Sequence, residues 1–189
     1  MSQNSENHII ATRYQKLGNL REAGFNFPNH YKPNSRVEAI QLEFNDQETI
    51  EDDRIFSIAG RIMSKRVVGK ISFCQIQDST GKLQIFVKRQ ILGDEAYKEF
   101  KKLDVGDIVY AQGPVARTQT GELSIEPTEV VMLTKNLHPL PEKFHGLTDT
   151  EQRYRQRYLD LMNNRDVQKS FILRSNLIKS IRHMFEDNS

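Results

Sequence analysis

One stretch of the chain carries basic side chains with no acid among them. Between residues 54 and 77 all charged residues are basic, and these residues are Arg54, Arg61, Lys65, Arg66 and Lys70. A surface with charge of one sign attracts and steers a polyanion. The alternative is a strand edge whose basic side chains protect it from pairing with another sheet. Charge alone leaves both interpretations open.

Side chains that could catalyse a reaction or hold a metal ion are scattered. The chain has one cysteine, Cys74, and its five histidines do not cluster in the sequence. Neither an internal disulfide nor a zinc site is therefore expected. His145 has no nucleophile or carboxylate constellation around it, and Asp149, Glu151 and Asp160 fit helix caps and salt bridges. We expect no catalytic residue and no metal ligand in these residues.

The composition is that of a folded chain. Hydrophobic residues make up 37% and charged residues 28% of 189 residues, which is enough apolar material for one domain with additions. The sequence has no run of 18 apolar residues and no basic flank followed by an apolar stretch near its start. A membrane span and a secretory signal are therefore not expected, and a cytoplasmic location fits the single cysteine.

Hydrophobic periodicity of two begins near residue 54. It predicts strands over 55–63, 71–77, 83–88, 106–115 and 123–133, with a short helix over 94–102. Three strands, a helix and two strands is the order of an OB-fold, a five-stranded Greek-key barrel that binds single strands on one open face. An SH3-like barrel or a small sandwich would have a similar number of strands, but the helix favours the OB-fold.

Helical patterns flank this barrel, so the predicted fold class is mainly β with α additions. Helices are expected over 6–24, 35–44, 149–162 and 166–186. The predicted organisation is a helical extension over 1–53, the OB-fold over 54–135, a linker over 136–148 and further helices over 149–189. Nothing in the sequence after the last helix could cover its apolar side, and we therefore expect the chain to be cut.

Two strings near the end of the chain carry a family resemblance. The string from Pro139 to Asp149 and the string from Arg153 to Leu161 closely resemble class II lysyl-tRNA synthetases of the bacterial type. The segment from Arg13 to Leu17, the run Gly81-Lys82-Leu83-Gln84 and the hairpin from Thr120 to Ile125 are similar to the same family. The resemblance covers essentially the whole chain. It implies an N-terminal extension, an anticodon-binding OB barrel and the first helices of a truncated catalytic domain.

The resemblance also assigns roles to individual residues. Phe73 lies where the family stacks an aromatic ring on an anticodon base, although a core phenylalanine is the alternative that alternation does not exclude. Gln84 lies where the family has a glutamine that reads uracil, since an amide both donates and accepts; the alternative is a solvated glutamine. Glu122 would accept from uracil N3–H, and its alternative is a surface acid beside a turn.

Among the basic residues, Arg66 matches an arginine that the family places near the anticodon. Arg61, Lys65 and Lys70 are weaker candidates, either as general phosphate contacts or as solvated charges. The family's ATP-binding arginine motif and glycine-rich motif do not occur among these residues. The resemblance therefore implies that this chain alone is inactive and has no cofactor.

The function that follows is lysine–tRNA ligation, of which this chain would supply recognition of the lysine tRNA anticodon. ATP, Mg²⁺ and lysine would be needed by the full-length enzyme, which the resemblance implies to be a homodimer. Two alternatives stay open: a free-standing OB module that binds tRNA or single strands, and a regulatory paralogue without catalysis. An aspartyl or asparaginyl synthetase is the nearest competing enzyme.

Overall fold

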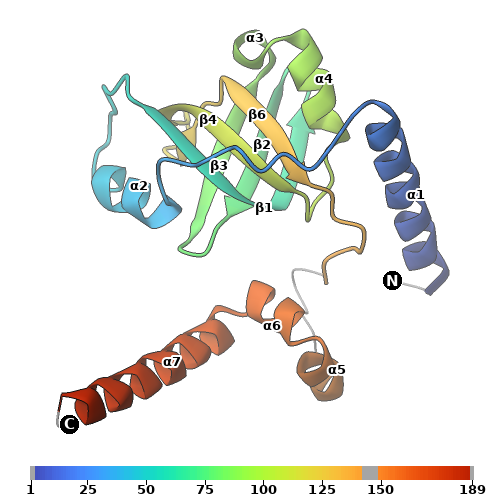
Figure 1. Ribbon diagram of the computed structural model, residues 1–189. Helices are drawn as coiled ribbons and strands as arrows, with labels where there is room; N and C mark the ends of the chain where they lie inside the picture. Colours follow the sequence, from blue (N-terminus) through green and yellow to red (C-terminus); the bar gives the residue numbers. More distant parts are fainter. Residues whose placement is uncertain (1–2, 142–148, 188–189) are drawn as a thin grey trace. The chain divides into compact units, whose positions relative to one another are not determined.

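The computed structural model describes residues 3–141 and 149–187. Contacts between residues divide the chain into two compact units, residues 1–139 and residues 140–189. The first unit holds all the strands, and Figure 1 shows them wound into a barrel with α4 and α2 against it. The second unit is helical wherever it has regular structure in the described residues. Each unit is described by itself.

The barrel is a ring of antiparallel strands with one parallel pair. Its strands are β1 (Ile55–Val68), β2 (Ile71–Gln77), β3 (Lys82–Lys88), β4 (Ile108–Arg117), β5 (Leu123–Ile125) and β6 (Glu129–Thr134). They pair in the order β1-β2-β3-β5-β4-β6, and a further pairing of β1 with β4 closes the ring. The pair β3–β5 is the parallel one. This is the strand order of the predicted OB barrel.

The last predicted strand is interrupted. Sequence periodicity indicated one strand over 123–133, whereas the structure has β5 and β6 on either side of Glu126, Pro127 and Thr128. Pro127 has no N–H to donate to a neighbouring strand. The interruption also brings the chain close to β4, since a Cβ at Gly113 would lie 2.1 Å from the Glu126 carbonyl oxygen. Glycine at this position therefore permits the bend.

Helices cover the barrel and complete its core. α2 (Val37–Phe44) contributes Val37, Ile40 and Phe44, all at most 2% exposed, to the same apolar cluster as the strands. α3 (Arg89–Leu92) and α4 (Asp94–Lys102) lie between β3 and β4, and α4 buries Tyr97 and Phe100. Residues from the predicted N-terminal extension thus take part in the core of the barrel.

The barrel interior holds the single cysteine of the chain. Cys74 on β2 is 1% exposed and lies in the apolar cluster. Burial raises the pKa of the Cys74 thiol to about 12, although the Lys65 ammonium acts in the opposite direction. The neighbouring Ser72 is fully buried too, and its hydroxyl lies 2.8 Å from the Tyr97 hydroxyl. A polar residue therefore faces inward here because α4 supplies its partner.

α1 (Gln3–Glu22) contacts the segments that flank β4 and β6 through charged groups. The Lys16 Nζ lies 2.7 Å from an Asp104 carboxylate oxygen, and the Arg13 guanidinium donates to the carbonyls of Val105 and His138. Behind Asp104, Lys135 pairs with both Asp104 and Asp107. Burial raises the pKa of the Asp104 carboxyl, but hydrogen bonds from Lys135 and Lys16 outweigh it and hold the pKa below its ordinary value.

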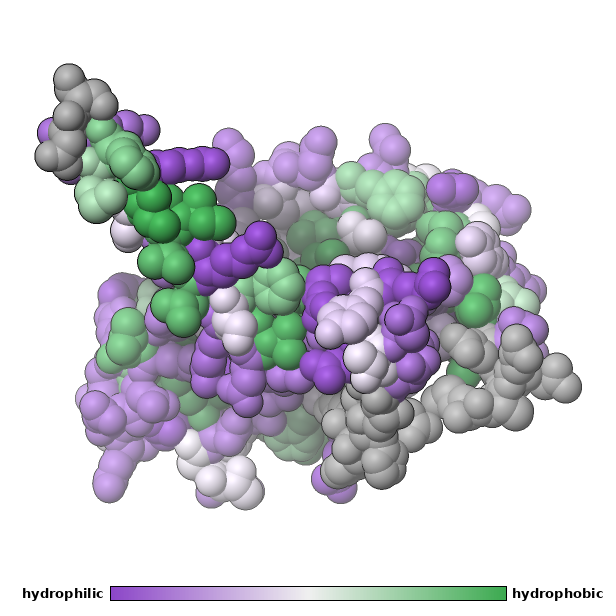
Figure 2. Space-filling model, turned by 90° about the horizontal axis from the view of Figure 1, so that it is seen from below, coloured by the Kyte–Doolittle hydropathy of each residue, from purple (hydrophilic) through white to green (hydrophobic). Residues whose placement is uncertain are grey.

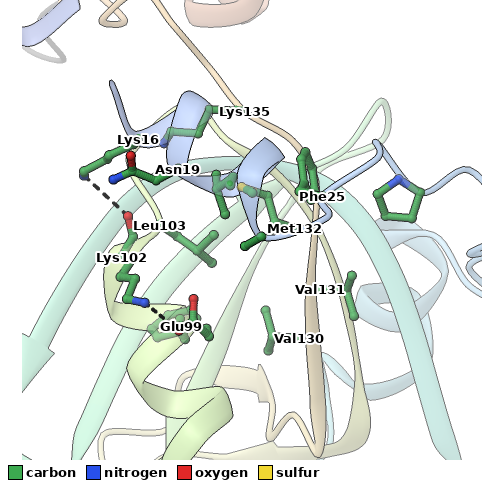
Figure 3. A pocket seen from close by; sticks show the side chains of 14 residues that line it. Lys16, Asn19, Phe25, Glu99, Lys102, Leu103, Val130, Val131, Met132 and Lys135 are labelled. Carbon is green, nitrogen blue, oxygen red and sulfur yellow. Dashed lines mark hydrogen bonds and ion pairs between the residues drawn. The ribbon is translucent and has the colours of Figure 1, made fainter. Parts of the chain in front are cut away.

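A cavity of about 630 Å³ separates the end of α1 from the barrel. Figure 3 shows Phe25, Leu103 and Met132 around it, and the ion pair of Lys102 with Glu99 at its edge. The contacts of Lys16 and Arg13 hold α1 to the barrel on one side of this cavity. Apolar side chains line the cavity but do not fill it.

The second unit consists of three helices, α5 (Thr150–Arg155), α6 (Arg157–Asn163) and α7 (Arg165–Glu186). The single helix expected over 149–162 is divided at Gln156. Asp160 is 4% exposed and pairs with Arg153 and Arg157, as its assignment to a salt bridge predicted. Residues 142–148, which include His145 and half of the predicted linker, lie outside the described residues.

α7 exposes a row of large hydrophobic side chains. Figure 2 shows hydrophobic residues gathered along this helix, at the upper left. The exposed ones are Phe171, Ile172, Leu173, Leu177, Ile178, Ile181, Met184 and Phe185. None of the helices in the described ranges combines the length and apolar composition that crossing a membrane requires.

Candidate nucleic-acid interface

The outer face of β2 and β3 carries the predicted base-contacting residues. Along both strands buried and half-buried residues alternate, as a pleated strand requires. Ser72, Cys74 and Ile76 face the core from β2, and Leu83, Ile85 and Val87 face it from β3. Phe73 and Gln84 are on the other, half-exposed face. Burial along β2 therefore shows which of the two alternating sides faces the core, and Phe73 is not a core residue.

Three side chains form a row across three neighbouring strands. Arg66 on β1 is opposite Phe73 on β2, and Phe73 is opposite Phe86 on β3. The two phenylalanine rings are parallel within 2° and their centroids are 4.9 Å apart, so each ring covers one face of the other. Since β1 lies on the opposite side of β2 from β3, the uncovered face of Phe73 is directed toward Arg66. Among the described residues no second ring or cation stacks on Phe73, so this face is available to a planar ligand.

The next row contains the hydrogen-bonding groups. Ser64, Gln75, Gln84 and Ser124 are opposite one another on β1, β2, β3 and β5. Gln84 Nε2 donates to Ser124 Oγ over 2.9 Å, and Ser124 Oγ donates to the Glu122 carbonyl over 3.2 Å. The carboxamide of Gln84 is thus fixed one row away from the free face of Phe73. Its Oε1 accepts no hydrogen bond from the part of the chain that the structure describes.

Glu122 lies at the end of this hydrogen-bonded chain. The sequence placed it at the start of the fifth strand, and in the structure it immediately precedes β5. Its backbone is fixed by Thr118, whose N–H donates to the Glu122 carbonyl and whose hydroxyl accepts from the Glu122 N–H. The side chain is exposed, and within the described residues its carboxylate makes no salt bridge. Its backbone is therefore linked to Gln84 through Ser124, and its carboxylate is accessible to a ligand.

The basic run separates into two groups in the structure. Arg66 and Lys70 are exposed, Arg66 in the aromatic row and Lys70 in the β1–β2 turn. Arg54, Arg61 and Lys65 are engaged within the protein. Arg54 pairs with Asp52 and Glu43, and Arg61 donates to the Gly106 carbonyl over 2.7 Å. Within the described residues, the predicted run therefore supplies two exposed cations whose side chains make no hydrogen bond or salt bridge, Arg66 and Lys70, rather than a continuous basic surface.

Lys65 has a structural role on the inner side of the barrel. Its ammonium group donates to the carbonyls of Phe100, Lys101 and Leu103 at the C-terminal end of α4. A cation at this end of a helix satisfies carbonyls that have no partner in the helix and complements the helix dipole. Burial lowers the pKa of the Lys65 ammonium, against the raising effect of Cys74 and Asp104. Lys65 is therefore not on the candidate face.

Four further residues of this site were not predicted from sequence: Phe86, Lys88 and Gln75 on the face, and the buried Ser124 beside it. Phe86 and Lys88 share the exposed side of β3 with Gln84, and the same alternation that assigned Gln84 could have found them. The Lys88 ammonium lies 4.8 Å from the centre of the Phe86 ring and pairs with Glu126. Gln75 shares the outer side of β2 with Phe73, so alternation could have found it as well. Ser124 depends on strand register, because β5 joins β3 through a parallel pairing between distant segments. Local sequence carries no signal for that pairing.

Comparison with known proteins adds to this geometry. Residues 56–133 match the family model of the OB-fold nucleic acid binding domain that occurs in tRNA anticodon recognition. The chain is 45% identical over 183 residues, or 95% of its length, to a lysine–tRNA ligase of Methylobacillus flagellatus. It is 49% identical to the enzyme of Xanthomonas campestris pv. campestris over 94% of its length, and 45% identical to that of Legionella pneumophila over 97%.

The alignments cover only part of these relatives. The chain spans 36% of the length of the Methylobacillus and Xanthomonas proteins and 37% of the Legionella protein. The predicted OB-fold and the predicted resemblance to lysine–tRNA ligases are confirmed. Within the matched portion, residues 56–133 carry the OB-fold nucleic acid binding domain.

Proposed function

Because residues 56–133 form a tRNA anticodon-binding OB-fold domain within a chain similar to lysine–tRNA ligases, we propose that this chain is the anticodon-recognising part of such an enzyme. Its ligand would be the uridine-rich anticodon of lysine tRNA. The observation that carries the proposal is the ring face of Phe73 that is directed toward the exposed Arg66, with the fixed amide of Gln84 one row away on β3.

Each group would have a separate task in binding. Phe73 would stack on a base, Gln84 and Glu122 would hydrogen-bond to the uracil edge, and Arg66 would contact the phosphate backbone or a base. Lys70 would add a weaker phosphate contact. Arg61 and Lys65 would act indirectly, since their hydrogen bonds support the barrel on which the face is built.

The free-standing module and the regulatory paralogue are not favoured. Similarity to the ligases continues beyond the OB-fold on both sides, since it covers 94–97% of the chain. A module recruited for general single-strand binding would not need the helices α5 to α7. The extent of the alignment therefore supports the enzyme over either alternative.

In the complete enzyme, lysine would be activated with ATP and Mg²⁺ and then transferred to tRNA. We propose that this chain contributes contacts to the tRNA anticodon and no catalytic residue to these steps. In the described residues there is no group of three or more histidine, cysteine or acidic side chains that could hold a metal ion. We propose that the complete enzyme is a cytoplasmic homodimer and that the isolated chain binds tRNA without aminoacylating it.

The test of base reading compares two RNA hairpins, one with a UUU loop and one with the central uridine replaced by cytidine. Gln84→Ala should reduce the preference for the UUU loop by about 1–3 kcal/mol, because the lost contact is to a base edge. Glu122→Gln should also reduce this preference, since it replaces an acceptor partly with a donor. Equal losses on both hairpins for both variants would contradict anticodon reading and leave a general single-strand binder.

Arg66 and Arg61 form a matched pair for testing phosphate contact. Arg66→Gln should reduce the slope of log K against log salt concentration by about 0.7–1, the contribution of one phosphate contact. Arg61→Gln should leave the slope unchanged, because its guanidinium is engaged by the Gly106 carbonyl. The measurement is hairpin affinity at several salt concentrations. An unchanged slope for Arg66→Gln would remove this residue from the phosphate contacts.

A further inference from the structure

A glutamine side chain by itself cannot distinguish uracil from cytosine. Its carboxamide presents an acceptor and a donor side by side, and rotation by 180° about its last bond exchanges them. Uracil presents N3–H as a donor next to a carbonyl acceptor, whereas cytosine presents N3 as an acceptor next to an amino donor. A freely rotating amide would match either base. Specificity requires that the orientation of the amide be fixed.

We propose that Ser124 fixes this orientation, and that it is the positioning residue for uridine selection on this face. This inference rests on the proposed function. Ser124 Oγ is fully buried and lies 2.9 Å from Gln84 Nε2. It is also 3.2 Å from the Glu122 carbonyl oxygen, a group that can only accept. The hydroxyl proton is thus directed toward Glu122, and the side of the oxygen that faces Gln84 is an acceptor.

An acceptor at this place requires the NH₂ end of the Gln84 amide, not its oxygen. The opposite orientation would put Gln84 Oε1 against a hydroxyl oxygen whose proton is already used, which leaves a repulsive contact of two acceptors. Oε1 is consequently presented to the ligand, where it can accept from uracil N3–H. The second N–H of the amide remains to donate to a uracil carbonyl.

The backbone makes this arrangement rigid. Gln84 and Ser124 are direct partners in the parallel β3–β5 pair, and Ser124 also belongs to the β4–β5 pair through Ala116. The Glu122 carbonyl that receives the Ser124 proton is itself held by the Thr118 N–H. One buried hydroxyl thus connects the two residues proposed to read uracil, although Ser124 itself is not exposed to the ligand.

Ser124→Ala tests the proposal through the direction of the change as well as its size. Removal of the hydroxyl frees the amide to rotate, so the chain should bind the UUU hairpin more weakly and the UCU hairpin more strongly. The preference for uridine should fall by about 2- to 12-fold, the range for one hydrogen bond. In the Gln84→Ala background the same substitution should have no effect on the preference, because Ser124 acts only through Gln84.

Ser72→Ala is the matched control. Ser72 is an equally buried serine of the same barrel, and its hydroxyl bonds to Tyr97 on the inner side. The substitution Ser72→Ala should lower the free energy of unfolding without changing the uridine preference. Ser124→Cys is the second variant if Ser124→Ala does not fold, since a thiol keeps nearly the same volume but is a weak acceptor.

The outcomes separate the two proposals. If the unmodified chain binds both hairpins equally, the proposed function is wrong and this inference fails with it. If the unmodified chain prefers UUU and loses that preference in Gln84→Ala but keeps it in Ser124→Ala and Ser124→Cys, only the role of Ser124 is wrong. Equal weakening of both hairpins by Ser124→Ala would likewise overturn it, because a general structural defect would act in that way.

Discussion

Replacing Phe73 with alanine should weaken the binding of any single-stranded RNA loop by about 1–3 kcal/mol, or roughly 5- to 150-fold. The reason is that every base has a π-face, and one ring face of Phe73 is directed toward Arg66 while Phe86 covers the other. The loss should therefore be similar on the UUU and UCU hairpins, in contrast to that of Gln84→Ala. Affinities of both hairpins at one salt concentration measure it.

Two further variants show whether stacking is the cause. Phe73→Tyr keeps an aromatic ring and should retain most of the affinity, whereas Phe73→Leu keeps only an apolar surface and should not. Phe86→Ala removes the ring that supports Phe73 but leaves the free face in place, so it should cost less than Phe73→Ala. Full affinity in Phe73→Leu would show that apolar coverage, not stacking, explains the contact.

Lys135→Met should lower the free energy of unfolding of the first unit by about 3–5 kcal/mol. The side chains of Lys135 and Asp107 are 2% and 0% exposed, and the ammonium group lies 2.8 Å from one carboxylate oxygen and 3.0 Å from the other. Methionine fills a similar volume but leaves the Asp107 charge buried without its counterion. Urea denaturation followed by the β-sheet circular dichroism signal measures the change.

Lys102→Met is the control for this effect. Lys102 pairs with Glu99 at the surface, where both side chains are more than half exposed, so its removal should change the unfolding free energy by less than about 0.5 kcal/mol. A second substitution, Asp107→Asn in the Lys135→Met background, should cost less than it does alone, because the unpaired charge is then gone. Strict additivity would show that burial of the pair does not determine its contribution.

The barrel could be predicted from sequence because its strands alternate and its turns carry glycine. Which side of a strand faces the core was harder to predict where residues on the inner side are polar. Ser72 can face the core because its hydroxyl is hydrogen-bonded to that of Tyr97, from a helix further along the chain. Phe73 therefore lies on the outer, half-buried face of β2, a side that the alternation of this strand alone did not determine.

The basic run shows a second limit of local reasoning. Lys65 and Arg66 are adjacent in sequence, yet alternation places them on opposite faces of β1, and the irregular pairing between Ile62 and Ser64 shifts the register of the preceding residues. The groups that occupy Lys65 are carbonyls at the end of α4, some 35 residues away. Charge counting treated all these cations as equivalent, whereas long-range contacts divide them into binding candidates and structural residues.

The rate at which the buried thiol of Cys74 is chemically modified can report how often β2 opens. Alkylating and disulfide reagents attack the thiolate, and a group that is 1% exposed with a pKa near 12 offers almost none at neutral pH. Modification therefore has to wait until β2 separates from its neighbours, and its rate reports the frequency of that opening. Since Phe73 is the next residue in the chain, a bound RNA that holds β2 in place would slow the reaction, with no label or engineered cysteine required.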